Sequence, residues 1–123
     1  MTSDSRYNIQ LDAKYGPLEV IDVPQLVEEC DLEWFNQTLC QVNESVSRLG
    51  IIHGEFHWHK HDEEDEFFLV LSGRLLIDLE ERTVDLAPHQ GFMIPKGVRH
   101  RTRAPERTVI LMVEKSGVNP EGD

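Results

Sequence analysis

Short apolar runs, each broken by a few turn-forming residues, fill the chain from Gln37 to Glu114. In order they read QTLCQVN, SVSRLGII, GEFHWHKH, EFFLVLS, RLLIDLE, RTVDLAP, GFMIP and RTVILMVE, and they are rich in Val, Ile, Leu, Phe and Thr. Many short strands at regular spacing are typical of a sandwich or barrel. The pattern therefore predicts an all-β fold, with a tight hairpin at residues 71–74 and Gly73 in its turn.

The part of the chain before these strands follows a different pattern. Residues 1–16 are polar and without a clear period, which predicts an irregular arm. Residues 18–22 are a short extended candidate, and one short helix is expected near residues 23–34. Its start is marked by Asp22 as N-cap and Pro24 in the first turn.

The length of 123 residues suits one domain. We expect an arm over 1–16, a single barrel domain over 17–116 that includes the helix, and an exposed tail over 117–123, where Gly, Asn and Pro are typical of a loop.

The charge balance narrows the classes of partner. The chain has 12 basic and 23 acidic residues, a formal net charge of −11. Such a chain is a poor match for nucleic-acid phosphates or an anionic membrane surface, so neither is expected as a partner. No signal peptide or apolar run of about 20 residues is visible, which favours a cytoplasmic protein. Cys30 and Cys40 are expected to be two reduced thiols.

The stretch HWHKHDEEDEFF, residues 57–68, carries the candidate chemistry. On a strand, His57, His59 and His61 would share one face, either as metal ligands or as part of a polar surface. Glu66 then opens an apolar strand, and an inward carboxylate there would be costly unless a positive partner, such as a divalent metal ion, lay beside it.

A further histidine follows a stiff turn in PKGVRH, residues 95–100. The segment HKHDEEDEFFLVLSG reads H-x-H-x4-E-x6-G, and PKGVRH reads P-x-G-x2-H. This pair of motifs resembles the two motifs of the cupin family, over roughly residues 37 to 115. The chain is similar to small single-domain, metal-binding cupins of the mannose-6-phosphate-isomerase-like group. The resemblance implies a cupin jelly-roll β-barrel with one short N-terminal helix.

The resemblance also implies a site. In metal-binding cupins the matching positions hold one divalent transition metal ion, here Fe, Mn, Ni, Co or Zn. Carried over by position, the ligands are His59, His61, Glu66 and His100. A pair formed by His57 and His59 is an alternative, but the spacing to Glu66 favours His59 and His61. His57 and Phe68 are assigned to the substrate pocket, although His57 could equally be a core histidine with a satisfied hydrogen bond.

Some positions depart from the family pattern. His53 and His89 stand where glycines are usual, and both are expected to be exposed in turns; Ala104 stands where asparagine is frequent. The acidic run over 62–65 is expected to be solvated. Arg99, Arg101 and Arg103 alternate out of phase with His100, so they are expected to face away from the pocket.

Two classes of function remain open at this stage. The first is a metal-dependent enzyme, isomerase-like or dioxygenase-like, acting on a small organic molecule. The second is a non-enzymatic cupin that binds or senses a metal or a small ligand. A homodimer is expected from the resemblance, because the outward positions of the motif strands are too apolar to face water. These positions are Phe56, Trp58, Phe67, Leu69 and Leu71.

Overall fold

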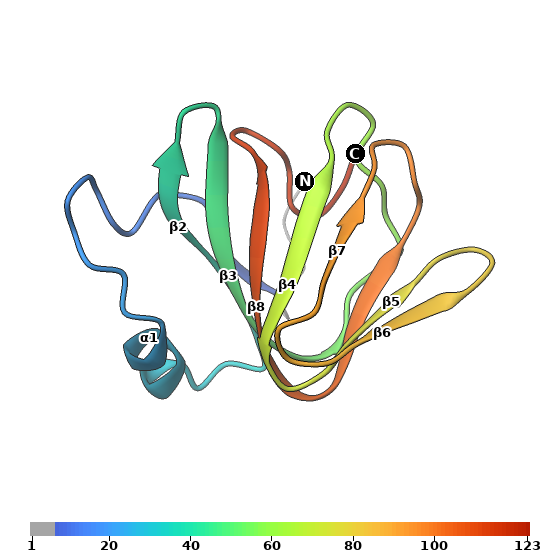
Figure 1. The fold of residues 1–123 in the computed structure, drawn as a ribbon, viewed down its shortest axis with the longest axis horizontal. Coiled ribbons are helices and arrows are strands. Elements are labelled where there is room, and N and C mark those ends of the chain that lie inside the picture. Colours follow the sequence, from blue (N-terminus) through green and yellow to red (C-terminus); the bar gives the residue numbers. More distant parts are fainter. Residues whose placement is uncertain (1–6) are drawn as a thin grey trace.

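The structure, a computed structural model, describes residues 7–123 and confirms an all-β fold with one short helix (Figure 1). Its elements are β1 (Asn8–Gln10), α1 (Val23–Glu29), β2 (Trp34–Val42), β3 (Ser45–Glu55), β4 (Glu66–Ser72), β5 (Leu75–Asp78), β6 (Thr83–Leu86), β7 (Gly91–Ile94) and β8 (Arg101–Lys115).

The long strand β8 joins the two layers of the jelly roll. Its second half pairs with β3 and β4, and its first half pairs with β5 over residues 101–103. The larger layer has the order β1-β2-β3-β8-β4-β7, and β6 pairs with β5 in the smaller one. Figure 1 shows the two layers facing each other across the interior. Because β8 pairs with strands of both layers, it fixes the position of one layer relative to the other.

The hairpin predicted at residues 71–74 is wrong, because β4 and β5 do not pair with each other. The turn instead takes the chain from one layer to the other. Gly73 lies there with a φ of 87°, and a Cβ at this position would overlap Thr108. Glycine is needed at this crossover for both reasons. The turn at Gly73 was predicted correctly from the local sequence. The local sequence does not show whether the strands on either side of a turn pair with each other.

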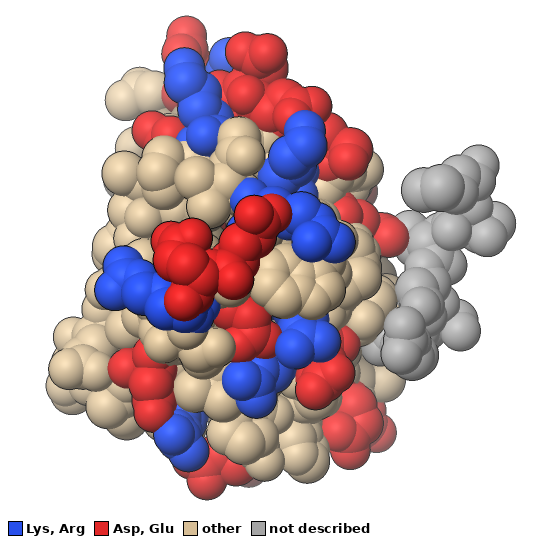
Figure 2. Space-filling view, turned by 90° about the vertical axis from the view of Figure 1, so that its right-hand side faces the viewer, with Lys and Arg blue, Asp and Glu red and all other residues tan. Residues whose placement is uncertain are grey.

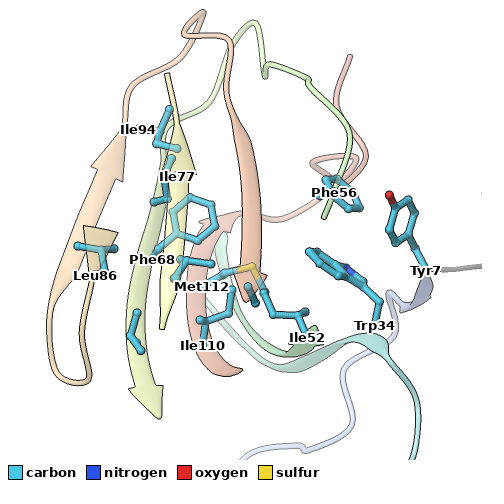
Figure 3. Packing of buried hydrophobic residues seen from close by; sticks show 13 residues of the cluster. Tyr7, Trp34, Ile52, Phe56, Phe68, Ile77, Leu86, Ile94, Ile110 and Met112 are labelled. Carbon is cyan, nitrogen blue, oxygen red and sulfur yellow. The ribbon is translucent and has the colours of Figure 1, made fainter. Parts of the chain in front are cut away.

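The interior of the barrel holds the larger of two hydrophobic clusters (Figure 3). Aromatic rings of Tyr7, Trp34 and Phe56 lie at one side of it, and Met112 lies between them and Phe68. Its buried members also include Ile52, Val70, Leu75, Ile77, Leu86, Ile94, Ala104 and Ile110.

The second cluster lies on the outside of the larger layer, beneath α1. Leu26 of the helix packs there with Leu39, Leu49, Ile51 and Val109. Asp22 caps the helix as predicted, since its side chain accepts a hydrogen bond from the amide of Gln25. The helix ends at Glu29, five residues before the predicted end. Trp34 is instead the first residue of β2, where its ring joins the barrel core.

The N-terminal segment is more ordered than its polar sequence predicts. Residues 1–6 lie outside the described part of the chain. Asn8–Gln10 form β1, which pairs in parallel with β2, and Tyr7 is buried against Trp34 and Phe56. The prediction of an irregular arm is therefore wrong for residues 7–10. The extended candidate at 18–22 forms no strand, and Leu18 and Val20 are exposed.

An ion-pair cluster fixes β5 against the first half of β8. The carboxylate of Asp78 accepts two hydrogen bonds from Arg103, at 2.7 and 3.0 Å, and another from Arg101 at 3.0 Å. These guanidinium groups, Arg103 first, hold the pKa of Asp78 well below its usual range. Figure 2 looks onto the side of β5 and β6, where basic and acidic side chains lie intermingled. The arginines of β8 are thus bound on the outside of the barrel.

Candidate metal centre

Four residues that are far apart in sequence meet at one end of the barrel interior. One ligand atom from each of His59, His61, Glu66 and His100 lies within 4.8 Å of every other. His59 and His61 follow β3, Glu66 is the first residue of β4, and His100 directly precedes β8. The four positions implied by the two motifs are therefore brought together.

The backbone that carries the histidines is not the regular strand predicted over residues 54–61. β3 ends at Glu55, and beyond it only one isolated bridge forms, between His59 and His100. Each of these two residues donates its amide to the other's carbonyl, at 2.8 and 2.9 Å. The amide of Gly97, in the turn before His100, also donates to the carbonyl of His61 at 2.7 Å. These bonds hold the two motif segments side by side.

Hydrogen bonds to the backbone also set the orientation of two imidazoles. Nδ1 of His59 donates to the carbonyl of His57 at 3.0 Å, and Nδ1 of His100 donates to the carbonyl of Val98 at 2.9 Å. A proton on Nδ1 leaves the lone pair of Nε2 free, which is how metal-binding histidines are usually prepared. Both rings are fixed as ligands before any ion arrives.

Glu66 places a carboxylate among these rings. It is 5% exposed, and its Oε1 lies 3.5 Å from Nε2 of His61 and 3.4 Å from Nε2 of His100. Burial opposes the charged form, but the two imidazoles overcome this and lower the pKa of Glu66. The site therefore keeps a negative charge in the barrel interior.

The imidazoles respond to the same burial in different ways. Burial lowers the pKa of His59 to about 4, so this ring is neutral at pH 7 and ready to bind a metal. For His61, burial acts in the same direction, but the adjacent carboxylate of Glu66 outweighs it and raises the pKa.

The arrangement fits a transition metal ion. Three ligand atoms, Nε2 of His61, Nε2 of His100 and Oε1 of Glu66, are buried and have no hydrogen-bond partner in the described part of the chain. An ion with N and O ligands at about 2.1 Å separates neighbouring ligand atoms by about 3 to 4 Å. The observed separations fall close to this range, and three imidazoles with one carboxylate suit Fe, Mn, Co, Ni or Zn.

A cavity adjoins the site. Phe68 lines it, as assigned from the sequence, and His59 and Glu66 connect it to the candidate metal centre. The remaining lining residues are Trp34, Asn36, Gly50, Ile52, Phe56, Thr102, Ile110, Met112 and Pro120. Sequence analysis missed Asn36, although it shares strand parity with the buried Trp34 and Thr38.

A buried ion pair lies next to the site and was also missed from the sequence. Glu114 on β8 is the ladder partner of Glu66, and its Oε1 lies 2.7 Å from Nε of Arg48. Arg48 donates in turn to the hydroxyl of Thr38 at 2.6 Å. Burial, together with the charge of Glu66, raises the pKa of Glu114. Arg48 supplies the positive charge that two adjacent carboxylates in a barrel require.

The segment after β8 is not the exposed tail that its sequence predicts. Val118 and Pro120 are buried, and the carbonyl of Glu121 lies 2.5 Å from Nε2 of His57. The amide of Asp123 donates to the carbonyl of Lys60 at 2.9 Å. The loop itself was predicted correctly from its Gly, Asn and Pro residues. Its contact with the histidine segment was not predicted, because local sequence does not show which distant segment a loop packs against.

His57 therefore differs from its neighbours. Its ring lies 5.3 Å from that of His59, yet it is not among the residues that line the cavity. Its described partner is the carbonyl of Glu121. The other two non-ligand histidines are exposed: His53 lies on β3, not in a turn, and His89 has a φ of 71° in the turn before β7.

Comparison with known proteins identifies the family. The family model described as "Cupin domain" matches residues 51–114, which contain all four clustered residues. This chain belongs to the cupin family. It is 45% identical over 80 residues to the uncharacterized protein YdbB of Bacillus subtilis strain 168, covering 64% of this chain and 71% of YdbB.

Two other relatives extend this comparison. A 45-residue stretch is 47% identical to a protein named polyketide synthase CurC of Streptomyces cyaneus, covering 37% of this cupin and 29% of CurC. The crystal structure of a cupin-2 domain containing protein from Shewanella frigidimarina NCIMB 400 is 30% identical with a TM-score of 0.74. The match covers 78% of this cupin and 94% of the Shewanella chain. Within residues 7–123, no helix has the length and apolar character needed to span a bilayer.

The first prediction concerns metal content. Purified wild-type protein should hold close to one equivalent of a transition metal, measured by elemental analysis. Replacing His59, His61 or His100 by alanine removes one of four ligands, so content should fall at least tenfold. His53→Ala, an exposed histidine close in sequence, is the matched control and should retain full content. Equal metal content in all variants would contradict the site.

The second prediction concerns the segment that covers the histidines. A Cβ on Gly122, whose φ is 95°, would lie 2.5 Å from Cβ of His59. Gly122→Ala should therefore release residues 118–123 and speed hydrogen exchange at the amide of Asp123, about tenfold or more. Gly117→Ala is the matched control, because Gly117 has a similar φ of 90° but open space around it. The same exchange rates in both variants would show that contact with His59 does not hold the segment.

Proposed function

We propose that this cupin is a metal-dependent enzyme acting on a small organic molecule bound inside the barrel. The observation that carries the proposal is that His59 and Glu66 lie on the wall of an internal cavity. Four protein ligands leave one or two positions open on a five- or six-coordinate ion, and a catalytic ion needs such an open position. An ion held here would adjoin the internal cavity.

The proposed chemistry divides between the ion and the chain. A bound divalent ion would supply Lewis-acid or redox chemistry to oxygen atoms of the ligand. His59, His61, Glu66 and His100 would hold the ion, and the carboxylate would offset part of its charge. Apolar side chains such as Phe68 and Met112 would limit water around the ligand.

A dioxygenase-like reaction is favoured over an isomerase-like one. An isomerase needs a positioned base that accepts a proton from the substrate. Among the residues that line the cavity, His59 and Glu66 are the titratable ones, and both are proposed ligands. His57 is bound to the carbonyl of Glu121 outside the lining. The candidate metal centre thus adjoins the cavity, but no lining residue other than the proposed ligands is available as a base for proton transfer.

One relative suggests which molecules to screen first. CurC carries the name of a polyketide synthase, and polyketides are carbon chains with ketone and enol oxygens. Neighbouring oxygens of this kind chelate divalent metals well. Small diketones, hydroxyketones and catechols are therefore the first substrate classes to test.

A non-enzymatic binding or sensing role is the second candidate. Two observations favour it: the cavity has no acid or base beyond the proposed ligands, and residues 118–123 cover the neighbouring histidine segment. A covered cavity of this kind could retain a ligand without converting it.

The test of enzymatic function follows oxygen and ligand together. Protein loaded with Fe²⁺ should consume oxygen with at least one compound of the three classes, and His100→Ala should lose this activity at least 100-fold. His53→Ala should keep it. Binding without oxygen uptake or product would support the sensing role. Equal turnover by His100→Ala would contradict a reaction at this site.

The expected homodimer is proposed to form through the outer face of the larger layer. Phe67 of β4 is the ladder partner of Met93 on β7 and of Val113 on β8. Met93 is 50% exposed and Val113 36%, so this patch on neighbouring strands has apolar surface available. The other predicted outward residues are accounted for differently. Phe56 is buried in the core, Leu71 packs with the helix cluster, and Trp58 lies beneath Arg99 and Arg101.

Light scattering after gel filtration tests the dimer. The mass should be twice the 14.2 kDa of one chain. Val113→Asp should give a monomer, because a charge in the patch would be desolvated on association. Val20→Asp, at a position that is 85% exposed away from the strands, is the matched control and should remain dimeric. A wild-type monomer at micromolar concentration would contradict the proposal.

A further inference from the structure

The cavity beside the candidate metal centre has mainly apolar walls and few polar side chains. Of its 12 lining residues, none is Lys or Arg, and seven are aromatic or aliphatic side chains: Trp34, Ile52, Phe56, Phe68, Ile110, Met112 and Pro120. Apart from His59 and Glu66, its polar side chains are Asn36 and Thr102. A ligand with several hydroxyls, or with a phosphate away from the metal, would lose hydration here without gaining partners.

Asn36 is the polar group that the fold leaves for a ligand. It is 8% exposed, it lines the cavity, and its Oδ1 has no hydrogen-bond partner within residues 7–123. Buried amide oxygens in folded proteins are nearly always paired, so an unpaired one facing a cavity indicates a missing partner. The neighbouring Gln37 differs, since the NH2 group of its side chain donates to the carbonyls of Asp12 and Thr38.

The position opposite Asn36 keeps this amide accessible. Its ladder partner on β3 is Gly50, which has no side chain to cover it. A Cβ on Gly50 would lie 2.8 Å from Cγ1 of Ile110 and 3.2 Å from Cε of Met112. The close packing of these two side chains therefore excludes a larger residue beside Asn36.

The apolar walls add a preference for shape. Trp34 and Phe56 are stacked, with ring centroids 5.3 Å apart and planes 14° apart, and they lie on the opposite side of Met112 from Phe68 (Figure 3). Flat aromatic walls bury a flat ring with good contact and little loss of side-chain freedom. The pocket thus has aromatic and aliphatic walls, the candidate metal centre at one side, and one amide oxygen that is unpaired within residues 7–123.

We infer that Asn36 is a specificity-determining residue of this site, and that its ligand is a small, planar, uncharged ring. The ring carries a pair of neighbouring oxygens for the metal and one additional hydroxyl or N–H that donates to Oδ1 of Asn36. This inference rests on the proposed function, because it places the oxygen pair on a metal held by His59, His61, Glu66 and His100. It excludes sugar acids and sugar phosphates as the preferred ligands.

The first arm of the test uses unaltered protein loaded with Zn²⁺, which is redox-inert. Calorimetry compares catechol, an apolar ring with an oxygen pair, with gluconate and mannose 6-phosphate, which are polyhydroxylated anions. Catechol should bind at least tenfold more tightly than either. Gluconate or mannose 6-phosphate binding as tightly as catechol would overturn the inference. This arm needs no variant, so it stands even if the variants below fail to fold.

The second arm tests the amide itself with two triols. Pyrogallol and 1,2,4-benzenetriol each add one hydroxyl to catechol, at different ring positions. At least one should bind about five- to tenfold more tightly than catechol, as expected for one added hydrogen bond. Asn36→Leu has a similar volume without the amide and should abolish this gain, measured as the ratio of triol affinity to catechol affinity in the same variant. Gln37→Leu, the matched control, should preserve the gain.

The outcomes separate the inference from the proposed function. A gain that persists in Asn36→Leu, or no gain with either triol, overturns the role of Asn36 even if the protein is an active enzyme. The expected ligand preference without any turnover supports the inference and counts against the enzyme. Failure of the protein to take up Zn²⁺ overturns both.

Discussion

The structure depends on one costly arrangement, a carboxylate buried with three imidazoles inside an apolar barrel. A buried charge without partners is expensive, and Glu66 is 5% exposed with its Oε1 more than 3 Å from the nearest imidazole nitrogens. Strand order, bridge and turns all serve to hold these groups at this spacing. A divalent ion would satisfy Nε2 of His61, Nε2 of His100 and Oε1 of Glu66 at once, which explains why the fold maintains the cluster.

The polar groups inside the barrel differ in their partners and in their roles. Glu66 belongs to the candidate metal centre, while the adjacent Glu114 is paired with Arg48 and belongs to the framework. Asn36 also lies in the interior, and its Oδ1 has no hydrogen-bond partner in the described part of the chain. Oε1 of Glu114 has a charged partner in Arg48, whereas Oδ1 of Asn36 has no hydrogen-bond partner within residues 7–123. Because buried polar groups in folded proteins are nearly always paired, this oxygen marks a position for a ligand donor.

The sequence predicted the all-β class, the helix cap and the four clustered residues, because these depend on alternation, capping chemistry and fixed spacing. It did not predict contacts that arise only when distant segments meet. Local pattern could not show that the turn at Gly73 joins two layers, that Tyr7 enters the core, or that the segment around Glu121 folds back over His57. It also missed Asn36, whose role is visible only once the opposite strand position is known to be glycine.

A cobalt titration tests most directly whether the His–Glu cluster is a metal site. Co²⁺ bound by three imidazoles and a carboxylate absorbs visible light, and the band shape reports its coordination. Metal-free wild-type protein should develop these bands and saturate at one Co²⁺ per chain, with a position left open to an added catechol. A spectrum that remains that of aqueous Co²⁺ would contradict the account.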